Sequence, residues 1–198
     1  MAAQRSTPVT PDDAELVRAT LAGRKAAFDD LIERYQRRAT AVAYRLLGNI
    51  HDALEVCQDA FIRAYRKLDA LEDPARFGPW LLRIVTNLSL NYRRSRGPRL
   101  SFEDCLLSED TSREERIADS PHSEDRPGAR LAATELEERV QAGLAQLPPQ
   151  QRAALVLFSV EQLPQKDVAQ ILDCSIEAVK WHVFQARRKM KEYLADFM

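Results

Sequence analysis

Two stretches of the chain contain apolar residues that recur every three or four positions, the spacing of an amphipathic helix. Helices are predicted near residues 12–22, 24–47, 51–71, 79–96, 131–146, 149–161, 164–173 and 175–195. Gly48 and Pro164 stand at two of the expected helix ends, where such residues are common. No alternation typical of a strand runs for more than four residues. The pattern therefore predicts an all-α fold.

Residues 98–130 separate the two helical stretches and show no sustained period. This segment is rich in Ser, Asp, Glu and Pro, a composition typical of a linker between domains. We therefore expect two small helical domains, at residues 1–97 and 131–198, joined by a flexible linker.

Only three residues, Asp173, Cys174 and Ser175, separate the last two predicted helices. The small Ala169 is available where the two helices would cross. Two short helices joined by so tight a turn predict a helix-turn-helix in the C-terminal domain.

The final predicted helix has two contrasting faces. Its apolar stripe consists of Val179, Val183, Ala186 and Met190. The opposite face combines cations with Trp and Phe, which have no packing reason to stand among charges. We expect this face to enter the major groove of DNA, although a protein contact is the alternative. The residues predicted to bind the duplex are Lys180, Trp181, His182, Phe184, Gln185, Arg187 and Arg188.

The helix predicted at 79–96 also has a polar face, on which two asparagines stand four residues apart. Asn is a poor helix former, but it hydrogen-bonds well to base edges. Aromatic rings beside cations can hold unstacked bases, although Phe77 and Trp80 could instead fill a small core. The residues predicted to bind a single strand are Phe77, Trp80, Arg83, Asn87, Asn91 and Arg94.

Basic residues gather around both predicted faces, although the 198-residue chain has a net charge of only −1. Between Pro74 and Phe102 there are six arginines and no acidic residue. Between Lys180 and Lys191 there are five cations and no acidic residue. Such clusters are typical of surfaces that bind polyanions, whereas the net charge is not informative.

Several classes of protein are excluded. There is no run of about 18 apolar residues and no apolar signal segment, so we expect a cytoplasmic protein without membrane insertion. Cys57, Cys105 and Cys174 form no CxxC pair, which argues against a disulfide framework or a zinc site. We expect Cys57 and Cys174 to be buried structural thiols. No nucleophilic triad or phosphate-binding loop is present, so no enzyme, metal or cofactor is expected.

Together, these motifs resemble bacterial sigma factors, specifically the small extracytoplasmic-function (ECF) group of the sigma-70 family. Residues 76–96 resemble regions 2.3 and 2.4 of the family, and residues 147–190 resemble region 4. The resemblance implies that the chain directs promoter-specific transcription initiation. The first domain would melt and hold the −10 element, with loop 70–77 capturing a flipped-out base. The second domain would read the −35 element as duplex.

Residues 52–69 resemble region 2.2, which docks on the β′ clamp helices of core RNA polymerase. The resemblance places at this contact Asp52, Glu55, Gln58, Asp59, Phe61, Ile62 and Tyr65. It also implies a contact with the β flap and an anti-sigma factor that holds the free protein inactive. Many members of the family have a glycine in the turn where Asp173 and Cys174 stand.

A response-regulator type of transcription regulator is an alternative, because residues 178–182 also resemble the recognition helix of that class. That class would need an α/β receiver or a ligand pocket within residues 1–97, which the helical pattern does not predict. A helical adaptor that binds polymerase but not DNA is a second alternative. It would not need the basic face between Lys180 and Lys191.

Overall fold

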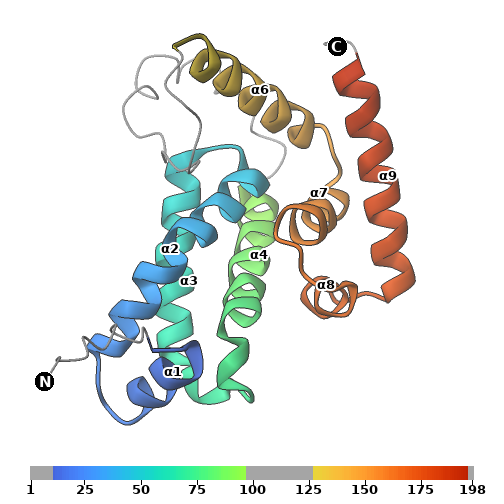
Figure 1. Ribbon diagram of the computed structural model, residues 1–198. Coiled ribbons are helices and arrows are strands. Elements are labelled where there is room, and N and C mark those ends of the chain that lie inside the picture. The colour runs from blue at the N-terminus through green and yellow to red at the C-terminus, as the bar shows by residue number, and fades with distance from the viewer. Residues whose placement is uncertain (1–10, 97–126, 196–198) are drawn as a thin grey trace, which may run out of the picture.

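The computed structural model describes residues 11–96 and 127–195, and within these ranges every regular element is a helix (Figure 1). The first group of helices comprises α1 (Asp13–Leu21), α2 (Ala26–Leu47), α3 (Ile50–Arg66), the short 3-10 turns η1 (Leu68–Ala70) and η2 (Pro74–Arg76), and α4 (Phe77–Arg96). The second comprises α6 (Pro127–Ala145), α7 (Pro149–Leu155), the π-helical turn η4 (Val156–Val160), α8 (Gln165–Leu172) and α9 (Ile176–Ala195). The predicted all-α fold is confirmed.

The observed helices differ from the predicted ones mainly at their ends. Helix α4 begins at Phe77, two residues before its predicted start, because Pro79 is accepted within a first helical turn. Helix α6 begins at Pro127, inside the segment 98–130 predicted as a linker. The rest of that segment, through residue 126, lies outside the described residues, and Cys105 lies there too.

Local sequence accounts for the helix ends in the first group. The carboxylate of Asp12 accepts a hydrogen bond from the Glu15 amide at 2.7 Å, and the Glu15 carboxylate accepts one from the Asp12 amide at 3.1 Å. This reciprocal pair satisfies amides that have no partner within α1. Gly48 ends α2 in the left-handed region, with φ of 84°, and Asn49 then caps α3.

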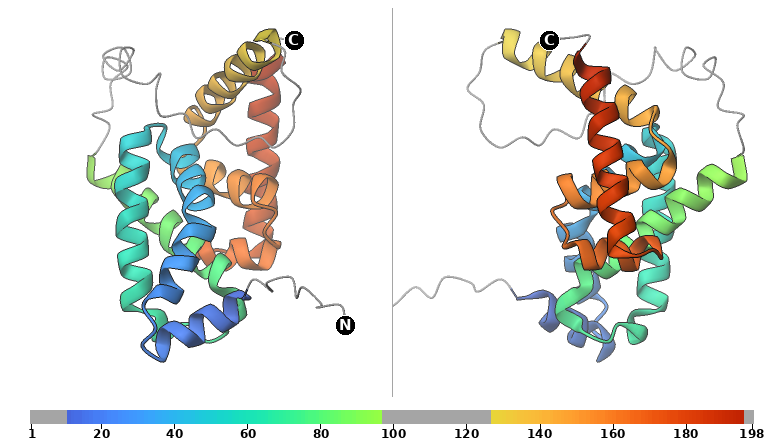
Figure 2. Two further views of the ribbon diagram at one scale, coloured as in Figure 1. Left: turned by 60° about the vertical axis from the view of Figure 1, so that its left-hand side comes forward. Right: turned by 90° about the vertical axis from the view of Figure 1, so that its right-hand side faces the viewer.

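The core of the first group forms where α2, α3 and α4 pack together, with α1 crossing one end. In the second group, α7 and α8 lie between the first group and α9 (Figures 1 and 2). The buried apolar residues of both groups form one continuous cluster. No helix in the part of the chain that the structure describes is long and apolar enough to cross a membrane.

Helices α8 and α9 form the predicted helix-turn-helix. The turn requires a left-handed residue, and Asp173 adopts this conformation with φ of 51° and ψ of 53°. Its conformation lets the Cys174 amide donate to the Ala169 carbonyl at 3.1 Å, which closes the end of α8. The Ser175 hydroxyl then accepts a hydrogen bond from the Ala178 amide at 3.1 Å, at the start of α9. Asp173 thus stands at a position suited to the glycine that the family often has.

The conformation of Asp173 leads to a stability prediction. Asp173→Ala should lower the free energy of unfolding by about 1 kcal/mol, because Ala enters the left-handed region less readily than Asp. Asp173→Gly should not lower it, because Gly enters that region without steric cost. Chemical denaturation measures both effects. Asp59→Gly, in the exposed middle of α3, is the control and should cost about 1 kcal/mol. An equal loss for the two glycine variants would contradict this role of Asp173.

Candidate functional site

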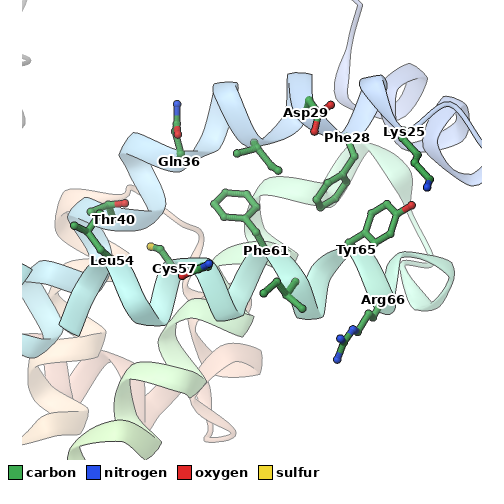
Figure 3. Close-up of a pocket in the computed structure, with 13 residues that line it drawn as sticks. Lys25, Phe28, Asp29, Gln36, Thr40, Leu54, Cys57, Phe61, Tyr65 and Arg66 are labelled. Atoms are coloured by element: carbon green, nitrogen blue, oxygen red, sulfur yellow. The ribbon is translucent and has the colours of Figure 1, made fainter. Parts of the chain in front are cut away.

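An apolar groove of about 720 Å³ lies between α2 and α3 (Figure 3). Three large apolar side chains of α3 remain exposed along it: Leu54 at 43%, Ile62 at 42% and Tyr65 at 44%. Phe28 and Phe61 form its inner wall, and Phe28 packs edge-on against Tyr65 with ring centres 5.0 Å apart. Apolar side chains gathered along a groove are typical of a surface that binds another protein.

Most of the predicted polymerase-facing residues line this groove or are exposed on α3, and one of them is buried. Gln58, Phe61, Ile62 and Tyr65 line the groove, and Glu55 and Asp59 are exposed on the same helix. Asp52 is buried, and its carboxylate accepts a hydrogen bond from the Tyr92 hydroxyl at 2.6 Å. Asp52 therefore links α3 to α4 and does not lie at the groove.

Cys57 forms part of the groove wall but does not present a reactive thiol. Burial raises its pKa to about 11, so the thiol stays protonated at neutral pH. Cys174, in the helix-turn-helix, is partly buried, and desolvation together with the charge of Asp173 raises its pKa. The expectation of buried thiols is confirmed for Cys57 and holds in part for Cys174.

The polar stripe of α4 lies on the solvent side of the helix. Arg83, Asn87, Asn91 and Arg94 are all exposed. Leu81 and Val85 are fully buried on the other side, as their spacing predicts. The helix therefore presents two carboxamides and two guanidinium groups in one row, where a nucleic-acid strand could reach them.

Phe77 does not belong to this exposed row, and the predicted base contact is wrong for it. Its side chain is fully buried, with ring centres 5.4 Å from Tyr35 and 6.3 Å from Phe28. At the next residue, Gly78, an added Cβ would lie 2.8 Å from the Tyr35 hydroxyl, so the backbone itself packs closely here. Trp80 is partly buried, and its ring centre lies 6.0 Å from that of Phe77, at the edge of this aromatic core.

A second buried face of α4 was not expected from the sequence. Leu82, Thr86 and Ser89 are fully buried, although two of them are polar. Their spacing of four and three residues places them on one face of the helix. Two of the three are polar, so the apolar pattern of the sequence does not reveal this face. Arg93 continues this row and donates to the Leu46 carbonyl at 3.1 Å. Burial lowers the pKa of Arg93, which acts here as a structural group.

Helix α9 carries the exposed face that its sequence predicts. Val179, Val183 and Ala186 are buried. On the opposite side, Trp181 is 54% exposed and Phe184 is 63% exposed. Residues three apart are neighbours on a helix surface, and adjoining exposed apolar side chains are typical of an interaction surface. Lys180 and Arg188 are exposed on the same helix.

The two arginines of this face differ in how firmly they are held. The Arg187 guanidinium lies 5.8 Å from the Phe158 ring centre and donates to the Ser159 hydroxyl at 3.1 Å. These contacts orient it before any ligand arrives. Arg188 lies 3.7 Å from Glu192, but both side chains are more than half exposed, so this ion pair holds it weakly.

His182 differs from its cationic neighbours. Its Nδ1 atom is buried without a hydrogen-bond partner in the protein, and its ring packs edge-on against Trp181 at 5.2 Å. Burial lowers the pKa of His182, which disfavours the charged form of the ring. The ring is therefore less suited to attract a phosphate than its cationic neighbours, although it can still form a hydrogen bond. Gln185 beside it is partly buried.

Comparison with known proteins decides the family. Residues 31–99 match the family described as Sigma-70 region 2, and residues 137–190 match Sigma-70, region 4. The ECF RNA polymerase sigma-E factor of Haemophilus influenzae is 31% identical over 190 residues, covering 94% of this chain and 97% of that protein. The chain belongs to the ECF group of the sigma-70 family. It is a sigma factor, a non-enzymatic transcription initiation factor that binds RNA polymerase and DNA.

Other relatives agree with this assignment. The ECF RNA polymerase sigma factor SigW of Bacillus subtilis is 29% identical over 176 residues, covering 88% of this sigma factor and 92% of SigW. Among solved structures, CnrH in complex with the cytosolic domain of CnrY has a TM-score of 0.63 and 28% identity, covering 93% of this sigma factor and 97% of CnrH. The match of residues 31–99 to sigma region 2 also removes the response-regulator alternative, which needed a receiver there.

Proposed function

We propose that this sigma factor directs RNA polymerase to promoters by holding the −10 element on α4 and the −35 element on α9. The main support is the presence of two exposed faces, one in each helical group, that combine polar or cationic side chains with aromatic ones. Their chemistry differs in a way that fits the two forms of DNA. The α4 face is rich in carboxamides, whereas the α9 face is rich in cations and exposed rings.

At the −10 element, Asn87 and Asn91 are suited to hydrogen-bond the edges of unpaired bases. Arg83 and Arg94, in the same exposed row, would hold phosphates of the non-template strand. Trp80 stands at the start of the row and offers a partly exposed ring for an unstacked base. Binding bases that are already unpaired would favour the melted promoter over the duplex, and the protein would aid melting in this way.

At the −35 element, α9 would lie in the major groove. Lys180 and Gln185 would reach base edges, and the exposed rings of Trp181 and Phe184 would contact thymine methyl groups or sugars. Arg187 is already oriented by Phe158, so binding a phosphate would cost it little conformational entropy.

The groove between α2 and α3 is the proposed surface for the β′ clamp helices of core polymerase. Ile62 and Tyr65 supply apolar contact, and Glu55, Gln58 and Asp59 on α3 supply polar groups. Asp52 would act indirectly, because its contact with Tyr92 holds α3 against α4. A contact of the second domain with the β flap rests on family resemblance alone.

We also propose that an anti-sigma factor regulates this protein. The structure of CnrH was solved with the cytosolic domain of CnrY, and that of RpoE from Bartonella quintana with the anti-sigma factor NepR. A partner of this kind could cover the exposed apolar groove between α2 and α3 when polymerase is absent.

The first test is transcription with purified components. The sigma factor added to core polymerase should give run-off transcripts from a subset of promoters in a genomic library. Core polymerase alone is the control, and it should give only non-specific transcripts. Failure to produce specific transcripts from any promoter would contradict the proposed function.

Asn87→Ala should reduce open-complex formation by roughly tenfold, because a lost hydrogen-bonding pair to a base is worth about 1–3 kcal/mol. Affinity for core polymerase should not change, since Asn87 is exposed on α4, away from the α2–α3 groove. Permanganate footprinting and a core-binding titration measure the two effects. Gln146→Ala removes an exposed carboxamide from the second domain and serves as the control. Equal losses in both assays would instead indicate a folding defect.

Arg188→Ala should weaken holoenzyme binding to a −35 duplex and make it less sensitive to salt. Each lost phosphate contact lowers the slope of log K against log salt by about 1. Arg18→Ala makes the same charge change on α1 and should leave the slope as it is. An unchanged slope for Arg188→Ala would remove this residue from the phosphate contacts.

A further inference from the structure

Helix α1 packs against η2 and α4, close to where the proposed single-strand face begins (Figures 1 and 2). The hydroxyl of Tyr35, on α2, donates a hydrogen bond to one oxygen of the Asp13 carboxylate on α1. Arg34 donates to the other oxygen of that carboxylate and to the Pro11 carbonyl, the latter at 2.7 Å. Asp13 therefore ties the start of α1 to α2 through one neutral donor and one charged donor.

The hydrogen bond to Asp13 fixes the orientation of the Tyr35 side chain. The ring is partly buried, and burial together with this hydrogen bond raises the pKa of Tyr35 to about 12. The hydroxyl therefore keeps its proton throughout the neutral range and remains a donor to Asp13. The Asp13 side chain is 18% exposed, and shielding from water strengthens a hydrogen bond to a charged acceptor.

The ring of Tyr35 lies directly against the backbone of Gly78, in the first turn of α4. A Cβ atom added at Gly78 would lie 2.8 Å from the Tyr35 hydroxyl oxygen, 2.9 Å from Cε1 and 3.1 Å from Cζ. Non-bonded carbon atoms pack at about 3.5–4.0 Å, so a larger residue at this position would displace the ring or the helix. Ala is normally preferred to Gly within a helix, and the close contact with Tyr35 explains why glycine stands here.

The contacts of Tyr35 also reach Trp80, two residues further along α4. Phe77 contacts both rings, with ring centres 5.4 Å from that of Tyr35 and 6.0 Å from that of Trp80. Phe77 is fully buried, whereas Trp80 is partly exposed. The partly exposed ring is therefore supported by a buried ring and by a close backbone contact, and Tyr35 takes part in both.

We propose that Asp13, Tyr35 and Gly78 are positioning residues for the single-strand face of α4. They hold the ring of Trp80 where it can stack on an unpaired base of the −10 element, so the inference rests on the proposed function of Trp80. A binding side chain must be held to within about 0.5 Å by neighbours that are themselves fixed by packing and hydrogen bonds. Asp13 fixes Tyr35, and Tyr35 determines how closely the first turn of α4 approaches α2.

Helix α1 has no role assigned by the family match, because the match to Sigma-70 region 2 begins at residue 31. The proposed role of α1 is to carry Asp13. The capping box of α1 depends on Asp12 and Glu15, so Asp13→Ala removes the contact to Tyr35 and leaves the cap in place.

Fluorine NMR of the free, full-length protein labelled with 5-fluorotryptophan tests the positioning without DNA. The chain contains two tryptophans, so Trp181 supplies an internal reference, and Trp181→Phe assigns the two signals. Gly78→Ala should shift and broaden the Trp80 signal, because the added Cβ displaces the neighbouring ring. Asp13→Ala should shift it less, and the Trp181 signal should stay in place in both variants.

Binding of a labelled −10 non-template strand to holoenzyme supplies the second measurement, with the strand taken from a promoter found in the run-off assay. Gly78→Ala should weaken binding about tenfold, within the range that stacking of one base on an aromatic ring provides. Asp13→Ala should weaken it about threefold. Asp30→Ala removes an exposed carboxylate of α2 and is the control. Affinity for core polymerase should not change, because neither Asp13 nor Gly78 lines the groove between α2 and α3.

A double variant tests whether Gly78 acts through Tyr35. Tyr35→Leu removes the ring atoms that the added Cβ would meet. In that background, Gly78→Ala should weaken single-strand binding by less than about twofold, because the two changes share one contact. An equal loss in both backgrounds would overturn the proposal. A folded Gly78→Ala protein with the wild-type Trp80 signal and wild-type single-strand affinity would overturn it as well.

Circular dichroism verifies that each variant is folded, and Asp13→Ala carries the test if Gly78→Ala does not fold. A folded Asp13→Ala protein that matches the wild type in both measurements would then overturn the proposal. Wild-type single-strand affinity of Trp80→Ala would instead contradict the proposed function of that ring. Because the fluorine spectrum involves neither polymerase nor DNA, it distinguishes a failure of the positioning from a failure of the proposed function.

Discussion

The C-terminal turn of α2 is the point on which most of the structure depends. The last carbonyls of a helix have no partners within it, and leaving them unpaired in a buried setting is costly. Arg93 from α4 and Arg152 from α7 both donate to the Leu46 carbonyl, and Gln141 from α6 donates to that of Tyr44. Completing one helix end therefore brings α4, α6 and α7 into contact with the same turn of α2.

The placement of aromatic rings separates the structural from the functional side chains. Phe77 is packed among Phe28 and Tyr35 and stabilises the start of α4, whereas Trp181 and Phe184 stand in water on α9. A ring in the core holds the helix that carries Asn87 in position, and a ring on the surface is available to DNA. The proposed −10 contact thus relies on carboxamides and arginines supported by an aromatic core, with Trp80 at its edge.

Some cations of the first group pair with carboxylates of the second group, and one of them stands beside the proposed DNA-binding helix. Arg38, Arg45 and Arg76 pair with Glu161 and Asp167 in the free chain. Arg76 stands beside the helix proposed to hold promoter DNA. A near-neutral protein can thus carry basic surfaces for DNA while part of their charge is matched internally.

The sequence by itself determined the helices, the C-cap at Gly48, the helix-turn-helix, and the exposed rows of α4 and α9. These features depend on residues within a few positions of one another, so periodicity and turn chemistry are enough to predict them. Only the tertiary structure decided the burial of Phe77 and Asp52 and the pairing of Glu161 with Arg38. Their partners are Tyr35, Tyr92 and a residue more than a hundred positions away, and no local pattern specifies which distant side chain will fill a buried space or meet a buried charge.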